Sequence, residues 1–389
     1  MEAPERAASS WRRRLVLLAG VLVPALLVRS CVLATFEIRS GSMAPALQDG
    51  DHLLVLRAPL DPAPIARWDI VVMDDRGLDA QGDELYDAVV KRVAGLAGEL
   101  IEVRNGDVWV GASEGSLQLA AKPDPLVRSL LIPVHEGSGL PAPWRWDGST
   151  AQEPLADGSV RLTAVEARAM AHFGAAITDG EPNAEGELVA DTALALQVGA
   201  GDATLLLGLR EGADAFRARL ASPDKGGASL HHNTAGGEVA RASAFSGLSP
   251  GQQVLFWNVD NHVRLWVDDE LVLAYDYEAN TRQPPGTTMV NTPELGLEGG
   301  SLDVAAVSVL RDLHYTCLGT YGTQPGGALT PYNVLPGDLF LLGDASQSSR
   351  DSRHFGGLSQ DGLMGRPLAI YQPWARARWL KRSGGKGSR

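Results

Sequence analysis

The sequence predicts a mainly β protein that combines an antiparallel β-rich domain, an inserted β-sandwich and an N-terminal transmembrane helix. Three observations support this fold class. Short apolar or β-branched runs separated by Pro, Gly and Asp recur between residues 37 and 110, a pattern typical of antiparallel strands. A second series of strand-like segments occupies residues 253–275. An unbroken apolar run covers residues 15–28.

The apolar run predicts a membrane anchor at residues 15–36. As a helix, Leu15 to Val28 is about 21 Å long, and continuation to Phe36 gives about 33 Å, enough to cross a hydrocarbon core of roughly 30 Å. The preceding segment, residues 1–14, contains Arg12–Arg14. The positive-inside rule therefore places it in the cytoplasm and the chain after Phe36 outside. A cleaved signal peptide shows the same pattern, and the residues alone do not separate the two readings.

Residues 37–110 contain strand signals and no helical period. Apolar or β-branched runs at residues 53–56, 70–73 and 88–93 predict three strands. Asn105-Gly106 lies between two further runs, which predicts a β-hairpin with a type I′ turn.

Between residues 126 and 311 the composition shifts toward Gly, Ala, Ser and Asp. Segments 253–259, 262–267 and 271–275 predict successive strands of an antiparallel β-sandwich. Side-chain alternation directs Val263 and Leu265 to the core and Arg264 to solvent. The stretch 164–172 predicts a short helix. The run 263–272 is similar to the lectin-type sandwiches of the laminin-G and concanavalin class.

The overall charge excludes a nucleic-acid-binding function. The chain contains 34 Lys and Arg and 47 Asp and Glu, which gives a net charge of -13. Nucleic-acid binding needs a basic face instead. Basic residues gather at the two ends, and residues 376–389 predict a basic flexible tail. The eight histidines form no metal-ligand pattern, so neither a metal nor a cofactor is predicted.

Three motifs carry the chemistry. The first is the Ser-Gly-Ser-Met-Ala-Pro turn at residues 40–45, and the second is Lys91 within an apolar strand-like run. The third begins at Gly343-Asp344 and ends with Ser349-Arg350-Asp351-Ser352-Arg353. In this order the motifs resemble those of the type I signal peptidases, membrane-anchored Ser/Lys endopeptidases. The resemblance covers the anchor, roughly residues 37–125 and roughly 312–372.

The resemblance implies a role for each motif residue. Ser42, directly before Met43, is the nucleophile, and Lys91 is the general base. A serine hydroxyl needs such a base, and burial lets a lysine serve because it disfavours the ammonium form. The backbone N–H of Ser42 and the hydroxyl of Ser40 form the oxyanion hole. Ser349 hydrogen-bonds the lysine, and Asp351 and Arg353 form a bracing ion pair. Arg92, next along the strand, is expected in solvent.

One motif departs from the family pattern. The family usually follows Gly-Asp with Asn-Arg-Asp-Asn-Ser, whereas Gly343-Asp344 is followed by Ala-Ser-Gln-Ser-Ser at residues 345–349. The serine, aspartate and final arginine remain, but polar and charged support around the lysine is lost. Reduced or specialised activity is therefore an open alternative.

The resemblance implies a signal-peptidase-type catalytic domain at residues 37–125 and 312–375, interrupted by the β-sandwich at 126–311. It implies removal of signal peptides from exported preproteins at the outer surface of the cytoplasmic membrane. The expected partners are signal peptides and membrane lipid, with a glycan or a protein as the ligand of the sandwich. Two alternatives stay open: a membrane-tethered lectin-like binding protein on a degenerate peptidase scaffold, and a peptidase dedicated to one client.

Overall fold

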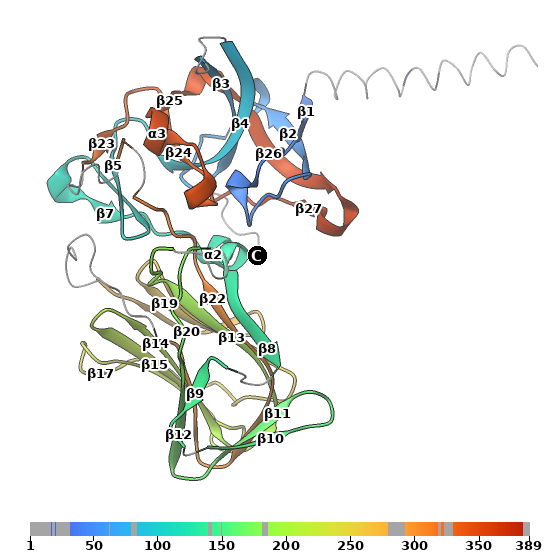
Figure 1. Cartoon of the computed structure of the whole chain (residues 1–389), viewed down its shortest axis with the longest axis vertical. Coiled ribbons are helices and arrows are strands. Elements are labelled where there is room, and N and C mark those ends of the chain that lie inside the picture. The colour runs from blue at the N-terminus through green and yellow to red at the C-terminus, as the bar shows by residue number, and fades with distance from the viewer. Residues whose placement is uncertain are drawn as a thin grey trace, which may run out of the picture. The chain divides into compact units, whose positions relative to one another are not determined.

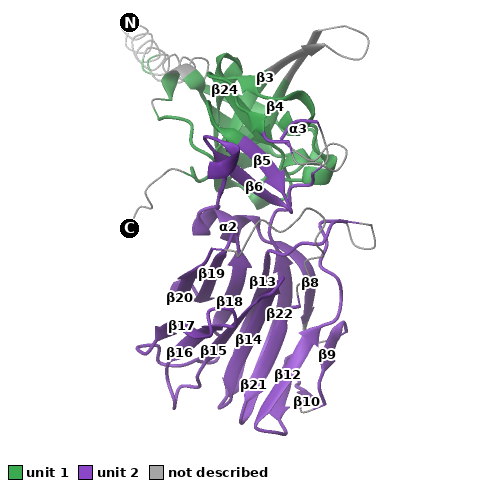
Figure 2. Ribbon diagram, turned by 90° about the vertical axis from the view of Figure 1, so that its left-hand side faces the viewer, with its two compact units in different colours: residues 1–100, 332–389 green, residues 101–331 purple. Residues whose placement is uncertain are grey.

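The computed structural model describes residues 17, 20, 32–61, 63–78, 84–138, 142–148, 150–180, 186–278, 292–317, 320–322 and 330–383. The chain divides into two compact units (Figures 1 and 2). Unit 1 comprises residues 1–100 and 332–389, and unit 2 comprises residues 101–331. Segments 101–125 and 312–331 thus fall into unit 2. The assignment of these two segments to the catalytic domain stays a prediction.

Unit 1 is built on one sheet with the order β1-β2-β26-β3-β4-β24-β25, and β27 also pairs with β26. The strands of this sheet are β1 (Leu33–Glu37), β2 (His52–Arg57), β3 (Ile70–Leu78), β4 (Glu84–Gly95), β24 (Asp338–Leu342), β25 (Leu358–Ser359), β26 (Leu363–Gln372) and β27 (Arg378–Trp379), and the short strand β23 (Tyr332–Asn333) lies outside it. Short helical segments are η1 (Gly41–Met43), η2 (Ala58–Leu60), η5 (Ser346–Ser348), α3 (Ser352–Phe355), η6 (Gln360–Gly362) and η7 (Trp374–Arg376). The predicted strands 53–56, 70–73 and 88–93 are confirmed within β2, β3 and β4.

Unit 2 is an antiparallel β-sandwich, as predicted (Figure 2). One sheet has the order β10-β11-β22-β13-β18-β19-β20, with β8 also paired to β22, and the other has the order β17-β16-β15-β14-β21-β12-β9. The first sheet contains β8 (Ile132–Ser138), β10 (Thr150–Pro154), β11 (Val160–Ala164), β13 (Thr192–Gly201), β18 (Gln253–Val259), β19 (His262–Val267), β20 (Glu270–Asp276) and β22 (Ser301–Arg311). The second contains β9 (Trp144–Trp146), β12 (Arg168–Phe173), β14 (Thr204–Glu211), β15 (Asp214–Leu220), β16 (Ala228–His232), β17 (Gly237–Ala242) and β21 (Glu294–Glu298).

Leucine, valine and phenylalanine side chains from both sheets, among them Leu194, Leu207, Phe216 and Phe256, form the core between them. Unit 2 also contains β5 (Leu100–Arg104), β6 (Asp107–Gly111), η3 (Glu114–Ser116), β7 (Gln118–Leu119) and α2 (Asp124–Leu130). β5 and β6 are neighbours joined by Asn105-Gly106, both with positive φ, which agrees with the predicted type I′ hairpin.

Two predictions for unit 2 are wrong. Residues 164–172 are not a helix: Ala164 ends β11, residues 165–167 bend, and β12 begins at Arg168. In β12 the buried residues Ala169, Ala171 and Phe173 alternate with more exposed ones, which is the period of a strand. Arg264 is not in solvent. It is 8 % exposed, and its guanidinium pairs with Asp124 at 3.1 Å and with Asp276 at 2.6 Å, which compensates its burial.

The predicted anchor, residues 15–36, lies mostly outside the described residues, and its end was predicted wrongly: residues 33–36 are not helical but belong to β1, which pairs with β2 in the sheet of unit 1. Among those described, no helix has both the length and the apolar character needed to cross a membrane. At the other end, the predicted flexible tail is structured over residues 376–383. β27 pairs with β26, and Arg376 forms two hydrogen bonds to Asp51, of 2.8 and 2.9 Å.

Candidate active site

The first motif forms a tight turn at the start of unit 1. Ser42 lies in η1, and the Ala44 N–H donates to the Gly41 carbonyl at 3.0 Å to close the turn. Met43 is 1 % exposed and packs among Ile38 and Leu47 in a small apolar cluster. Because the neighbouring residue is anchored in the core, the half-buried Ser42 hydroxyl is held at a defined place.

The second motif meets the first. The Nζ of Lys91, on β4, donates to the Oγ of Ser42 at 2.7 Å, and the Oγ of Ser40 lies 3.2 Å from that same Oγ. The two residues lie 49 positions apart in the sequence, Ser42 in the turn η1 and Lys91 on β4. Serine and lysine side chains at this distance can exchange a proton directly.

The environment of Lys91 favours the neutral amine. Its side chain is 5 % exposed. Burial lowers the pKa of Lys91 below its usual 10.5, although the negative charges of Asp351 and Asp344 act to raise it. Burial is the larger effect, because an ammonium loses its hydration in an apolar setting. Lys91 therefore titrates below the range of a solvent-exposed lysine.

The third motif packs directly against the first. After β24, the Ala345 N–H donates to the Ser42 carbonyl at 3.0 Å. Gly343 leaves no room for a side chain, since a Cβ there would lie 2.1 Å from the Oγ of Ser349 and 2.6 Å from the Ser42 carbonyl. The glycine is required by this close approach and not by its backbone angles.

Asp351 and Arg353 form a buried ion pair, both 0 % exposed. Arg353 donates to the two carboxylate oxygens at 2.9 and 2.8 Å and also to the carbonyl of Ser346 at 2.8 Å. The Gly343 N–H donates to Asp351 at 2.9 Å. Burial acts to raise the pKa of Asp351, but the hydrogen bonds and charge of Arg353 and the Gly343 N–H bring it below 3.8. The pair links α3 to the glycine beside Ser42.

Ser349 is placed near this arrangement but without the expected contact. It is 4 % exposed and its Oγ lies beside Gly343. In the described part of the chain that Oγ makes no hydrogen bond to Lys91, whereas its interaction with the Asp351 carboxylate is one of the effects that lower the pKa of Asp351. Its role in supporting the lysine stays a prediction.

Arg92 is buried, so the prediction that it lies in solvent is wrong. It is 2 % exposed and donates to both oxygens of Asp344, at 2.7 and 2.6 Å, and to the carbonyl of Trp68 at 2.8 Å. Lys91 and Arg92 are consecutive along the strand, but both faces of β4 are covered here, so neither side chain reaches solvent. The signal that could have identified the pair is the motif Gly343-Asp344, which contains an aspartate without an assigned partner.

Unit 2 contains a carboxylate cluster that the sequence did not predict. Carboxylate oxygens of Asp107, Asp191 and Asp260 lie within 4.8 Å of one another, a grouping that could hold a cation. The ammonium of Lys122 already lies 2.8 Å from Asp260 and 2.8 Å from Asp312. Lys122 thus serves as an internal counter-ion for this cluster.

The sequence comparisons identify relatives of the chain, and the matched residues fall in both units. The family described as signal peptidase, peptidase S26, matches residues 10–123 and 250–374, more than half of the chain. A probable signal peptidase I-1 of Synechocystis is 38 % identical over 99 residues, 25 % of this chain and 50 % of that protein. A signal peptidase I of Bacillus licheniformis is 30 % identical over 101 residues, 26 % of this chain and 50 % of that protein. The chain thus spans about half the length of these curated relatives.

The structural comparisons find distant likenesses. A Bacillus subtilis protein of unknown function with a galectin-like fold covers 46 % of this chain and 97 % of its own, at 10 % identity and a TM-score of 0.34. The carbohydrate-binding module CBM66 of Bacillus subtilis covers 44 % of this chain and 98 % of its own, at 8 % identity and a TM-score of 0.30. Both scores are too low to assign a ligand to unit 2.

Proposed function

Because the chain belongs to the signal peptidase family, peptidase S26, we propose that it is a membrane-bound serine endopeptidase that removes signal peptides from exported preproteins. The observation that carries the proposal is the 2.7 Å hydrogen bond between Lys91 Nζ and Ser42 Oγ. In the proposed reaction the neutral amine of Lys91 takes the Ser42 proton as the hydroxyl attacks the scissile carbonyl. The resulting ammonium then returns a proton to the leaving amine.

The oxyanion of the tetrahedral intermediate needs hydrogen-bond donors. We assign the backbone N–H of Ser42 and the hydroxyl of Ser40 to that role. The 3.2 Å separation of the Ser40 and Ser42 hydroxyl oxygens supports this assignment, because a donor must lie close to the attacked carbonyl to stabilise the charge that develops there. Ser40 is exposed and can therefore reach a bound substrate.

The proposed place of action is the outer surface of the cytoplasmic membrane, with the apolar segment that precedes β1 as anchor. Ser42 lies ten residues beyond Val32, the last residue before β1, within about 35 Å even if that segment is fully extended. Trp374 and Trp379 are 83 % and 75 % exposed, and Lys381 and Arg382 follow them. Exposed tryptophans beside basic residues are typical of a surface that contacts lipid headgroups.

Cleavage of a preprotein by the detergent-solubilised full chain tests the dyad. We expect Ser42→Ala and Lys91→Ala each to lower the rate at least about a thousandfold, whereas Lys225→Ala, at an exposed lysine of unit 2, retains it. The wild-type rate should fall as the pH drops through an apparent pKa below 10.5, because Lys91 must be neutral and burial lowers its pKa. Full activity in either dyad variant would refute the mechanism.

Lipid contact has its own test. In vesicles that contain anionic lipid with brominated acyl chains, we expect tryptophan fluorescence of the wild type to be quenched. The variant that carries both Trp374→Ala and Trp379→Ala should show markedly less quenching, since buried tryptophans such as Trp257 remain shielded. Equal quenching in both proteins would argue against this surface as the lipid contact.

A second function is favoured by the altered third motif. Residues 345–349 lack the charged residues usual in the family, and Ser349 makes no hydrogen bond to Lys91. If the folded wild type cleaves none of a panel of preproteins, a membrane-tethered binding protein on a degenerate peptidase scaffold becomes the better reading. Cleavage of one preprotein alone would indicate a dedicated peptidase.

A further inference from the structure

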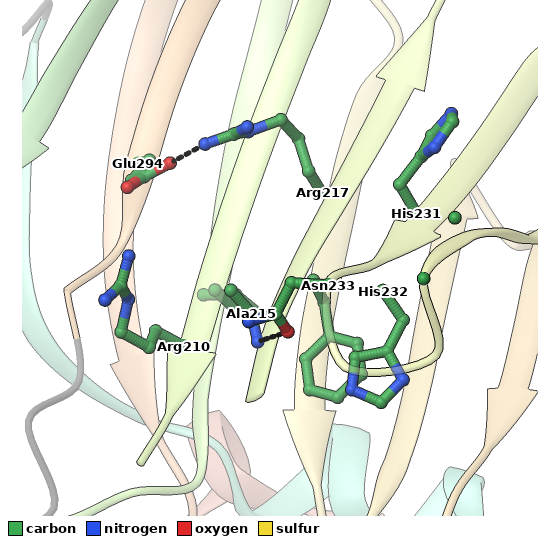
Figure 3. A pocket seen from close by; sticks show the side chains of 11 residues that line it. Arg210, Ala215, Arg217, His231, His232, Asn233 and Glu294 are labelled. Carbon is green, nitrogen blue, oxygen red and sulfur yellow. Dashed lines mark hydrogen bonds and ion pairs between the residues drawn. The ribbon is translucent and has the colours of Figure 1, made fainter. Parts of the chain in front are cut away.

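Unit 2 has a pocket on the outer face of its seven-stranded sheet, with a volume of about 360 Å³ (Figure 3). The sheet places its lining residues by alternation. Leu209 and Phe216 face the core at 2 % and 1 % exposure, so their neighbours Arg210 and Arg217 face outward. The lining thus combines outward-facing polar residues with the core residues Leu209 and Phe216, and it includes no residue of the proposed active site.

Strand register aligns four of its residues in one row across the sheet. His231 on β16 pairs with Arg217 on β15, Arg217 with Gly208 on β14, and Gly208 with Glu294 on β21. A Cβ at Gly208 would lie 2.7 Å from the Glu294 carboxylate. The Glu294 side chain thus lies across the glycine, where Arg217 donates to it at 2.8 Å.

The next row across the sheet contains Arg210 and Ala215 and adds a second arginine to the lining. Ala215 pairs with Arg210, and the Ala215 N–H donates to the side-chain oxygen of Asn233 at 2.7 Å (Figure 3). Arg210 is exposed, and among the described residues no carboxylate lies within ion-pair distance of its guanidinium. With Glu294 paired to Arg217, the lining carries an excess positive charge in a chain whose net charge is -13.

We propose that this pocket binds a polyhydroxylated carboxylate of the uronic acid class, with Arg210 as the carboxylate-binding residue. A guanidinium recognises a carboxylate through two parallel hydrogen bonds. Glu294 can accept from ligand hydroxyl groups, and Arg217 and His231 add further polar contacts. No large apolar side chain is exposed in the lining, so a hydrophobic peptide gains little there. The volume lies at the lower end of the range for small-ligand sites.

This inference concerns unit 2 alone and goes beyond the proposed peptidase activity. Its test is binding, measured by titration calorimetry with the detergent-solubilised full chain. The probes are trigalacturonate and the same trisaccharide with its carboxylates reduced to hydroxymethyl groups. We expect trigalacturonate to bind at least about tenfold more tightly than the reduced analogue.

Variants locate the site. Arg210→Gln should weaken trigalacturonate binding at least about tenfold, and Ala215→Leu should abolish it by filling the pocket. Arg219→Gln is the matched control, because Arg219 lies on the same strand and pairs with Glu298 at 2.8 Å outside the pocket. The Arg219→Gln variant should bind trigalacturonate with the same affinity as the wild type.

Three results would overturn the proposal. The first is the absence of trigalacturonate binding by the folded wild type, and the second is equal affinity for the reduced analogue. The third is tighter binding of a short peptide with a free carboxyl terminus, lost in Arg210→Gln, which would assign the pocket to peptides instead. Preprotein cleavage by the same samples reports the peptidase function separately, so the two proposals can fail independently.

Discussion

Two opposing electrostatic effects act on the pKa of Lys91. Burial removes hydration from its ammonium and lowers its pKa, while the buried carboxylates of Asp351 and Asp344 raise it. Each carboxylate is in turn paired with an arginine, Arg353 or Arg92. The arginines neutralise much of the charge that would otherwise keep Lys91 protonated, so the lysine can act as a base near its own hydroxyl partner.

The pair of Asp351 and Arg353 gives a prediction at this scale. Asp351→Asn leaves Arg353 buried without its counter-ion, so we expect the free energy of unfolding to fall by about 3–5 kcal/mol. The acidic limb of the pH–rate profile should also move to lower pH, because a charge that raises the pKa of Lys91 is lost. Denaturant unfolding and the pH–rate profile measure the two effects.

The exposed pair of Arg39 and Glu37 provides the control for this prediction. Their side chains are 83 % and 44 % exposed, so Glu37→Gln should cost under about 1 kcal/mol. A cost for Asp351→Asn as small as that of the control, together with an unmoved acidic limb, would show that the buried pair does not tune the site.

At the scale of elements, the site depends on how closely the turn after β24 approaches η1. Backbone atoms make this contact. The Ala345 N–H donates to the Ser42 carbonyl, and Gly343 lies against the same carbonyl. Sequence predicted β2, the strand that follows η1, because alternation and turn residues are local signals. It could not predict the missing contact of Ser349, since a side-chain hydrogen bond depends on the path of the intervening turn.

Gly343→Ala tests this approach. A Cβ would lie 2.1 Å from the Ser349 Oγ and 2.6 Å from the Ser42 carbonyl, so the backbone that carries the nucleophile must shift. We expect at least about a hundredfold lower turnover, because small misplacements of reacting groups are costly. Gly115→Ala is the control, since nothing lies within 4 Å of a Cβ there. Unchanged turnover in Gly343→Ala would mean that this approach does not position Ser42.

At the scale of the whole molecule, the two units respond differently to pH. In unit 1 the pKa values of Asp51, Asp61 and Asp351 lie below 3.8. Their contribution to stability is therefore present above that value and lost at lower pH. In unit 2, burial and mutual repulsion raise the pKa values of Asp107 and Asp191 well above 3.8, and burial raises that of Asp312 to about 6.

Because of these raised pKa values, we expect unit 2 to be less stable at neutral pH than at mildly acidic pH. Its folded carboxyl groups hold protons that the unfolded chain releases, so their contribution declines as the pH rises from about 4 through about 6. Thermal unfolding of the full chain should show a lower transition temperature for unit 2 at pH 7.5 than at pH 5. Asp107→Asn should reduce the difference, because it removes one of the repelling charges. A higher transition temperature at pH 7.5 in the wild type would contradict this account.

The sequence by itself determined the mainly β class, several strands of each unit, the turn at Asn105-Gly106 and the order of the three motifs. These features follow from periodicity and turn chemistry, which act over a few neighbouring residues. The Ser42 and Lys91 pairing was predictable only because the motifs resemble those of a known family.

The tertiary structure alone decided which polar residues are buried and what they contact. Arg92 and Arg264 look like solvent-facing strand residues in the sequence, yet both are buried against carboxylates. Likewise, Asp107, Asp191 and Asp260 are scattered along the chain but converge in space. Such contacts depend on which strands become neighbours and which faces another layer covers, and no local pattern of residues encodes either.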